Sequence, residues 1–386
     1  MKANKSFIEA MRRATQLVRA GGPVAATRFI QGLLRPERRS TGNEQPAPAA
    51  YDVDIDSLVN PVSPGPHAPA SPTSLPDASG EFLAQRFSGH AGSRNYKLYV
   101  PSGDTSAPLP LLVMLHGCTQ NPDDFATGTR ANRWAQSRRC LVVYPQQIQR
   151  ANSHRCWNWF RPLDQQAGRG EPAIIAGIVK QVIDEYRVDT RRVYVAGLSA
   201  GGAMAAIVAR EYPDLFAAAA VHSGLPAGAA HDVTSALTVM KTGRPKFAST
   251  GATRAIRRFV PVIALHGDAD STVNPANSDW LIDSAVDMHR MLNPDSPLHK
   301  TAQTINATDA SRAVQRTRYL APGGASIIEH WVVRGAAHAW SGGDAAGSYA
   351  DARGPDATAA ILDFFAQHAM PASIATPQVM DSTAPA

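Results

Sequence analysis

Apolar residues recur along most of the chain in short runs, and longer segments with helical periodicity lie between them. Two alternating runs on either side of residues 89–93 predict an antiparallel hairpin. After it, runs that are apolar throughout predict buried strands at residues 111–115, 141–144, 193–196, 217–222, 260–265 and 327–333. Strands that are apolar on both faces and alternate with amphipathic helices indicate a mostly parallel sheet covered by helices. The segments 225–258 and 293–321 interrupt this alternation, and we expect them as insertions over the sheet.

The same pattern divides the chain into four parts. Residues 1–35 place apolar side chains at helical spacing among basic ones, which predicts an amphipathic helical arm. Residues 36–79 are rich in Pro, Ala and Ser, and such a composition buries too little apolar surface to fold, so it predicts a linker. Residues 80–370 hold the alternating strands and helices of a single α/β domain, and residues 371–386 are expected as a flexible tail.

The positive charge of the chain is concentrated in the arm. The formal net charge is +6, while residues 1–40 contain nine Lys and Arg against two Glu (9 − 2 = +7), which leaves about −1 for the rest. A neutral body gives no reason to expect a nucleic acid partner, and no apolar run is long enough to span a membrane. A basic amphipathic arm is typical of a segment that lies on an anionic or apolar surface, and packing on the body of the protein is the alternative.

A serine motif follows the predicted strand at 193–196. The sequence Gly-Leu-Ser-Ala-Gly at 197–201 leads directly into an alanine-rich helical pattern. A strand, a sharp turn and a helix with serine at the apex form the nucleophile elbow of α/β-hydrolases. The glycines two residues before and after Ser199 leave room for this turn. The sequence therefore predicts an α/β-hydrolase fold with Ser199 as the nucleophile.

The other members of a catalytic triad follow in the chain order that α/β-hydrolases use, serine, then acid, then histidine. Asp270 and His338 each come shortly after a predicted strand. Ser199 would attack an ester carbonyl, His338 would carry its proton, and Asp270 would orient the imidazole. Asp268 is the alternative acid, and we favour Asp270 because the chain needs the intervening turn to reach over the sheet.

The loop at 115–120, after the first predicted parallel strand, is expected to complete an oxyanion hole. There the backbone N–H of Cys118 would join that of Ala200 to hold the developing negative charge. Cys118 and Cys156 both flank the expected site and are the candidate disulfide pair, although three reduced thiols, with Cys140, fit equally well.

Aromatic residues gather near the expected site. We expect Trp157, Asn158, Trp159 and Trp340 to form a wall of the substrate cleft, with core packing as the alternative. The chain contains no metal-ligand spacing and no phosphate loop, so we expect neither a metal nor an organic cofactor.

Taken together, these motifs resemble the polyhydroxybutyrate (PHB) depolymerase family of esterases. The matching segments lie at residues 115–120, 144–147, 156–160, 197–204, 266–270 and 335–343. The resemblance covers residues 80–370 and implies a triad of Ser199, Asp270 and His338 that hydrolyses poly(3-hydroxybutyrate) or its oligomers through an acyl-enzyme. Feruloyl and acetylxylan esterases belong to the same family, and a carboxylesterase acting on small or plant-polymer esters is the alternative.

The resemblance also bears on location. Extracellular members of the family usually carry a signal peptide and a C-terminal substrate-binding domain, and we expect neither here. Charge recurs through residues 1–35, which leaves no uninterrupted apolar stretch for a signal peptide. The chain in this respect is similar to the intracellular depolymerases. We therefore expect a cytoplasmic protein whose arm docks on polyester granules, with secretion or the periplasm as the alternative.

Overall fold

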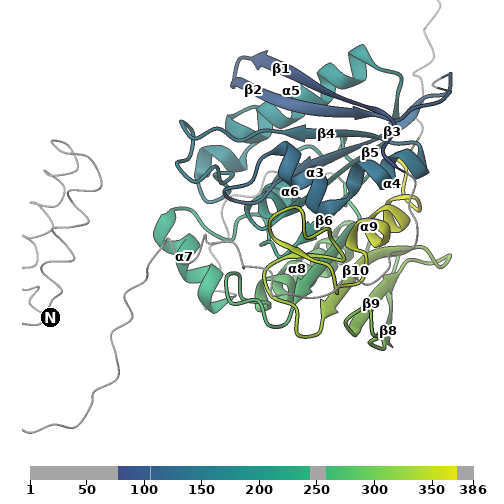
Figure 1. The fold of residues 1–386 in the computed structure, drawn as a ribbon. Helices are drawn as coiled ribbons and strands as arrows, with labels where there is room; N and C mark the ends of the chain where they lie inside the picture. The colour runs from purple at the N-terminus through teal and green to yellow at the C-terminus, as the bar shows by residue number, and fades with distance from the viewer. Residues whose placement is uncertain (1–76, 105, 244–257, 372–386) are drawn as a thin grey trace, which may run out of the picture. The chain divides into compact units, whose positions relative to one another are not determined.

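The computed structural model describes residues 77–104, 106–243 and 258–371. Within these residues a ten-stranded sheet has the strand order β1-β2-β4-β3-β5-β6-β7-β10-β9-β8 (Figure 1). The strands are β1 (Glu81–Gly89), β2 (Gly92–Val100), β3 (Leu109–Leu115), β4 (Leu141–Pro145), β5 (Val188–Leu198), β6 (Ala218–His222), β7 (Val262–Gly267), β8 (His299–Ile305), β9 (Val314–Leu320) and β10 (Ser326–Val333).

The centre of the sheet is parallel, as the apolar runs predict. Strands β4, β3, β5, β6, β7 and β10 pair in parallel, while β1 and β2 form the predicted antiparallel hairpin. Each parallel strand runs through the core and leaves its carboxyl end at the same edge of the sheet, where α/β folds place their sites. The predicted α/β-hydrolase fold is confirmed.

Helices cover both faces of this sheet (Figure 1). Helices α5 (Gly170–Glu185) and α6 (Ala200–Glu211) lie on one face, and α3 (Pro122–Thr129), α4 (Ala131–Arg138) and α9 (Ala357–Phe365) lie on the other. Alternate residues of β3 join the two cores: Leu111, Val113 and Leu115 pack with α5 and α6, and Leu112 and Met114 pack on the opposite face. Burial on both faces explains why β3 is continuously apolar.

The two segments expected as insertions differ from each other. Residues 293–321 form β8 and β9, an antiparallel hairpin that extends the sheet beside β10, so this expectation is wrong. The hairpin strands are polar because most of their residues are partly or fully exposed, which hides them from a search for apolar runs. Within 225–258, helix α7 (Val233–Thr242) packs near helix α8 (Ala276–Leu292), and residues 244–257 lie outside the described part.

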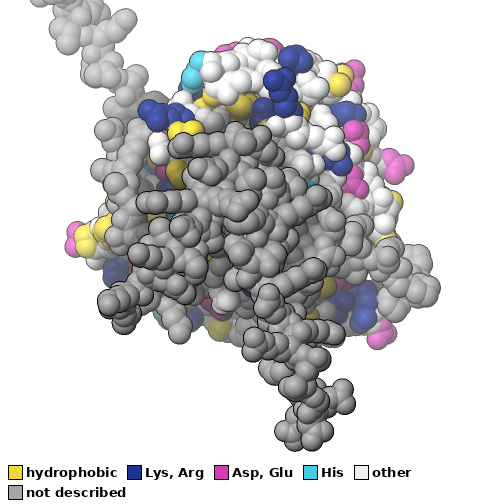
Figure 2. Space-filling model, turned by 90° about the vertical axis from the view of Figure 1, so that its left-hand side faces the viewer, with side chains coloured by type: hydrophobic (Ala, Val, Ile, Leu, Met, Phe, Trp, Pro, Cys, Tyr) yellow, Lys and Arg dark blue, Asp and Glu magenta, His cyan; other side chains and the backbone are white. Residues whose placement is uncertain are grey.

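Several expectations concern parts of the chain outside the described residues. The arm at 1–35, nearly all of the linker at 36–79 and of the tail at 371–386 belong to this group, so these domain boundaries stay predictions. Among the described residues, no helix has the length and hydrophobicity needed to cross a membrane. Where described side chains are visible in Figure 2, basic and acidic ones lie interspersed, in keeping with a body that is nearly neutral.

Candidate active site

Ser199 lies at the sharp turn between β5 and α6. Its backbone has φ 57° and ψ −120°, a combination that residues with a side chain rarely adopt. The turn brings backbones into contact: a Cβ at Gly197 would lie 2.3 Å from the carbonyl carbon of Gly201. A Cβ at Gly201 would lie 2.0 Å from the oxygen of Leu115. Glycine is therefore required at both positions, and the elbow has the geometry that the motif predicts.

The loops after β7 and β10 bring Asp270 and His338 together. Nδ1 of His338 donates a hydrogen bond to Oδ2 of Asp270 at 2.6 Å. The other carboxylate oxygen, Oδ1, accepts from the backbone N–H groups of Thr272 and Val273 at 2.9 and 2.8 Å. Both oxygens are thus held, and the imidazole is fixed in one orientation by a buried carboxylate.

Asp268 has a different set of partners. It accepts a hydrogen bond from the backbone N–H of Gly335 at 2.6 Å and pairs with Arg334 at 3.1 Å. These contacts fix the loop after β10 from outside. Of the two aspartates left open by the sequence, Asp270 is therefore the one that contacts His338.

Charge at Asp270 is stabilised by two histidines. Burial alone would raise the pKa of its carboxyl group, but hydrogen bonds from His266 and His338 outweigh this effect and hold the pKa well below its usual range. Nε2 of His266 lies 3.1 Å from Oδ2 of Asp270 and 2.9 Å from the oxygen of Val273. His266 is not among the site residues that the sequence analysis predicts; its position four residues before Asp270, at the end of β7, is the signal that points to it.

The loop expected to provide the oxyanion hole lies over the elbow. A Cβ added at Gly117 would be 3.7 Å from Cβ of Ser199. The backbone N–H of Gly117 donates to Oε1 of Gln120 at 2.9 Å, which holds this loop in a tight turn. Cys118 is the next residue, and Ala200 begins α6, where the first N–H groups have no partner within the helix. The two expected donors thus belong to the two segments beside Ser199.

Cys118 and Cys156 form a disulfide, and Cys140 is a buried free thiol. The candidate pairing is confirmed. The bond ties the loop at 115–120 to the segment after β4 and closes a chain separation of 38 residues. By the loop-entropy account, a cross-link of this span stabilises the fold by about 4 kcal/mol.

The residues expected in a cleft wall lie in the interior instead. Trp157, Trp159 and Trp340 are 0%, 5% and 1% exposed, and Asn158 is 1% exposed. The indole N–H of Trp340 donates to Oγ1 of Thr358, and its ring stacks on His222 with centroids 5.0 Å apart. The expectation that these four residues form a cleft wall is therefore wrong, and the alternative of core packing is correct. The large aromatic rings of the three tryptophans stabilise the fold by burying apolar area.

His222 contacts the segment after β10 that carries His338. Its Nε2 accepts a hydrogen bond from the backbone N–H of Ser341 at 3.0 Å, and burial lowers the pKa of its imidazole to about 3. The backbone oxygen of His222 also accepts from the N–H of Ser199 at 2.9 Å. A neutral, buried His222 therefore contacts segments on both sides of the site. Within the described residues, no group of three or more His, Cys, Asp or Glu side chains is arranged to hold a metal ion.

Known proteins with similar sequences are ester hydrolases by name. Residues 94–318 match the protein family described as Esterase PHB depolymerase. Poly(3-hydroxyalkanoate) depolymerase C of Paucimonas lemoignei is 33% identical over 262 residues, covering 65% of this chain and 60% of that protein. Probable acetylxylan esterase A of Aspergillus fumigatus is 36% identical over 135 residues, and feruloyl esterase B of Thermothelomyces thermophilus is 34% identical over 140.

These alignments cover less than two thirds of the relatives. The match spans 34% of the Aspergillus fumigatus protein and 47% of the Thermothelomyces thermophilus protein. Among solved structures, the acetyl xylan esterase from Aspergillus awamori aligns with a TM-score of 0.55 at 20% identity, covering 74% of this chain and 99% of that chain. This likeness establishes a shared fold.

Proposed function

Because the chain belongs to the esterase PHB depolymerase family, we propose that it is a serine ester hydrolase whose chemistry is performed by Ser199, His338 and Asp270. The observation that carries the proposal is the 2.6 Å hydrogen bond between His338 and the buried carboxylate of Asp270. An oriented imidazole is what a serine needs to act as a nucleophile near neutral pH.

The proposed reaction proceeds in two halves. Oγ of Ser199 attacks the ester carbonyl carbon while Nε2 of His338 takes the hydroxyl proton, and the N–H groups of Cys118 and Ala200 hold the oxyanion. The intermediate expels the alcohol, which leaves with the proton from His338, and an acyl-enzyme forms. A water molecule then repeats the attack with His338 as the base, which releases the acid and restores Ser199.

We propose poly(3-hydroxybutyrate) or its oligomers as the substrate. The alignment that supports this choice is the one with a poly(3-hydroxyalkanoate) depolymerase, because it covers 65% of this chain. The alignments with the acetylxylan and feruloyl esterases named above cover 34% and 36% of it. An esterase for acetylated or feruloylated plant polymers is the second candidate, since relatives with those names align with this chain at 36% and 34% identity.

A substrate panel separates the two candidates. The full chain is incubated with amorphous poly(3-hydroxybutyrate) granules, an acetylated xylo-oligosaccharide and methyl ferulate, with Ser199→Ala as the blank. We expect release of soluble 3-hydroxybutyrate products and at least about 100-fold lower kcat/KM for the other two esters than for a soluble 3-hydroxybutyrate oligomer. The reverse ranking would assign the enzyme to the second candidate.

We further propose that residues 1–35 dock the enzyme on polyester granules. The +7 charge of residues 1–40 and the helical spacing of their apolar side chains support a surface contact. A chain that lacks residues 1–78 should turn over a soluble ester at the full rate but sediment with granules less than the complete chain. A full-length chain in which the nine Lys and Arg of residues 1–40 are replaced by glutamine is the control for chain length. Docking would be contradicted if the truncated chain and the glutamine variant both sediment with granules as the complete chain does.

The disulfide bears on where the enzyme works. Disulfides persist in oxidising compartments and are rare in the reducing cytoplasm. The pairing of Cys118 with Cys156 therefore supports the secreted or periplasmic alternative over the cytoplasm. Docking on polyester particles is compatible with either location.

A further inference from the structure

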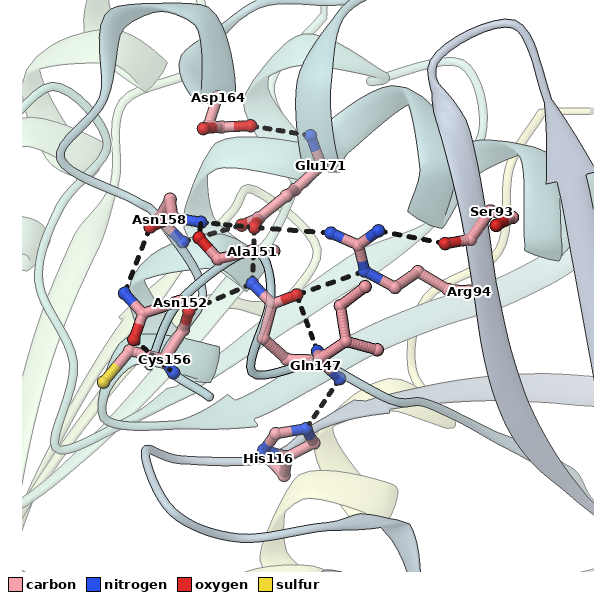
Figure 3. Close-up of polar contacts among 11 residues, drawn as sticks. Ser93, Arg94, His116, Gln147, Ala151, Asn152, Cys156, Asn158, Asp164 and Glu171 are labelled. Atoms are coloured by element: carbon pink, nitrogen blue, oxygen red, sulfur yellow. Dashed lines mark hydrogen bonds and ion pairs between the residues drawn. The ribbon is translucent and has the colours of Figure 1, made fainter. Parts of the chain in front are cut away.

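A buried polar cluster adjoins the loop at 115–120 through His116 (Figure 3), and it contains none of Ser199, Asp270 and His338. Its side chains are all less than a tenth exposed: Arg94, His116, Gln147, Asn158, Asp164 and Glu171. Burial of so many polar groups is costly unless each finds a partner, and a fully connected network of this kind fixes one conformation. The arrangement of its hydrogen bonds indicates what it fixes.

Glu171 is the centre of the cluster. One carboxylate oxygen, Oε1, accepts from Nδ2 of Asn158 at 2.6 Å and from Nε2 of Gln147, and the other accepts from the backbone N–H of Asn158 at 2.6 Å. Arg94 lies 3.8 Å away as its ionic partner. Because every hydrogen-bond partner of the Glu171 side chain is a donor, the site is built for a carboxylate rather than for an amide.

Gln147 is held in one orientation by its neighbours. Its Oε1 accepts from Nε of Arg94 at 3.1 Å, while its Nε2 donates to Glu171 and to the backbone oxygen of Cys156 at 3.0 Å. With the side chain locked, the backbone N–H of Gln147 points at His116 and donates to its Nε2 at 3.1 Å (Figure 3).

This hydrogen bond decides the tautomer of His116. Since Nε2 is an acceptor, the proton is on Nδ1, which donates to the backbone oxygen of Gly117 at 2.7 Å. Burial lowers the pKa of the imidazole to about 4, so the ring is neutral at the pH values where an esterase works. His116 thus connects the backbone of Gln147 to the carbonyl group of Gly117 through one hydrogen bond on each ring nitrogen.

The Gly117 carbonyl and the Cys118 N–H belong to the same peptide. A trans peptide is planar, and its C=O and N–H point in opposite directions. By holding the carbonyl on the side of the buried cluster, His116 keeps the Cys118 N–H on the other side of the loop. The loop needs this support because Thr119, the residue after Cys118, has a φ of 65°, a strained backbone conformation for a residue with a side chain. A flip of this peptide would present an oxygen where the oxyanion needs a donor.

We propose that His116, Gln147 and Glu171 are positioning residues for ester hydrolysis, which fix the Gly117–Cys118 peptide so that the Cys118 N–H is presented to the oxyanion. The inference rests on the proposed function, since it needs a tetrahedral intermediate formed by Ser199. None of the three side chains contacts the reacting atoms. They stabilise the transition state indirectly, because they orient one hydrogen bond donor, the backbone N–H of Cys118.

Two substitutions of His116 give a matched test. Asparagine places an amide nitrogen where Nδ1 lies and can keep the bond to Gly117, whereas glutamine places its amide at the position of Nε2 and can keep only the bond to Gln147. For a soluble butyrate ester, His116→Gln should lower kcat about 10²–10³-fold with little change in KM, as expected for the loss of one oxyanion donor. His116→Asn should recover most of that loss.

Glu171→Gln tests the far end of the cluster, with Asp164→Asn as its control. Asp164 is buried beside it and holds the backbone N–H of Glu171 at 2.8 Å, but it makes no hydrogen bond to Gln147. Both variants should lower the melting temperature. Glu171→Gln should also lower kcat by about 10-fold or more, a larger loss than in Asp164→Asn, and should weaken inhibition by a trifluoromethyl ketone in proportion, because this inhibitor forms a tetrahedral adduct with the serine.

The outcomes separate the two proposals. If Ser199→Ala keeps its turnover of the same ester, the proposed function is wrong and this inference is overturned with it. If Ser199→Ala is inactive but the two His116 variants have equal kcat values, the function stands and the positioning role is overturned. Equal effects of Glu171→Gln and Asp164→Asn on kcat would likewise reduce Glu171 to a structural residue.

Discussion

Replacement of Ser199 by alanine or by glycine should lower kcat for a soluble ester by about 10⁶-fold, and the two variants should differ in stability. The serine has φ 57° and ψ −120°, and a residue with a Cβ in such a region costs the fold about 1–3 kcal/mol. Glycine adopts these angles freely, although it loses more chain entropy on folding. Ser199→Gly should therefore be more stable than Ser199→Ala by about 1 kcal/mol.

Urea unfolding followed by circular dichroism measures this difference, and ester turnover by the same preparations measures kcat. The comparison between the two inactive variants removes any contribution of the hydroxyl group itself. A glycine variant that is less stable than the alanine variant would contradict strain at the elbow. Residual turnover of more than about 1% in Ser199→Ala would point to a different nucleophile, since loss of the attacking group is expected to cost far more.

The sequence predicts the elbow and the order of the triad because their signals are local. Ser199 lies between two glycines whose Cβ atoms would collide with backbone, and the apolar runs before Asp270 and His338 are strands buried on both faces. Local composition, in contrast, does not distinguish Trp157 in a cleft wall from Trp157 in the core. That distinction depends on how the segment after β4 folds back over α5, which involves residues far apart in the chain.

The same reason explains why the cluster around Glu171 was not predicted. Glu171 begins a helix and looks like an ordinary acidic residue of a first turn. Its partners Arg94 and Gln147 come from β2 and from the loop after β4, and only the sheet order brings these segments together. The polar hairpin of β8 and β9 was missed for the opposite reason, because an exposed edge strand needs no apolar run.

Asp270→Asn should lower kcat by about 10⁴-fold, while Asp268→Asn should change it less than about 3-fold. Oδ1 of Asp270 is held by two backbone N–H groups, so the amide oxygen of asparagine would take that position. The NH₂ group would then face Nδ1 of His338, which must give up its proton to accept a hydrogen bond. The imidazole proton would move to Nε2, where it blocks transfer from Ser199.

The two aspartates make this a controlled comparison, since they lie two residues apart on one loop. Asp268 contacts Gly335 and Arg334, so its substitution loosens the same loop without changing the tautomer of His338. We measure kcat of both variants for a soluble ester, together with their circular dichroism spectra. The comparison shows whether the loss of activity comes from the wrong tautomer of His338 or from a displaced loop after β10. A larger loss of kcat in Asp268→Asn than in Asp270→Asn would mean that the position of the loop after β10, which carries His338, limits catalysis. Asp270 is the aspartate that contacts Nδ1 of His338 and so determines which nitrogen of the ring is protonated.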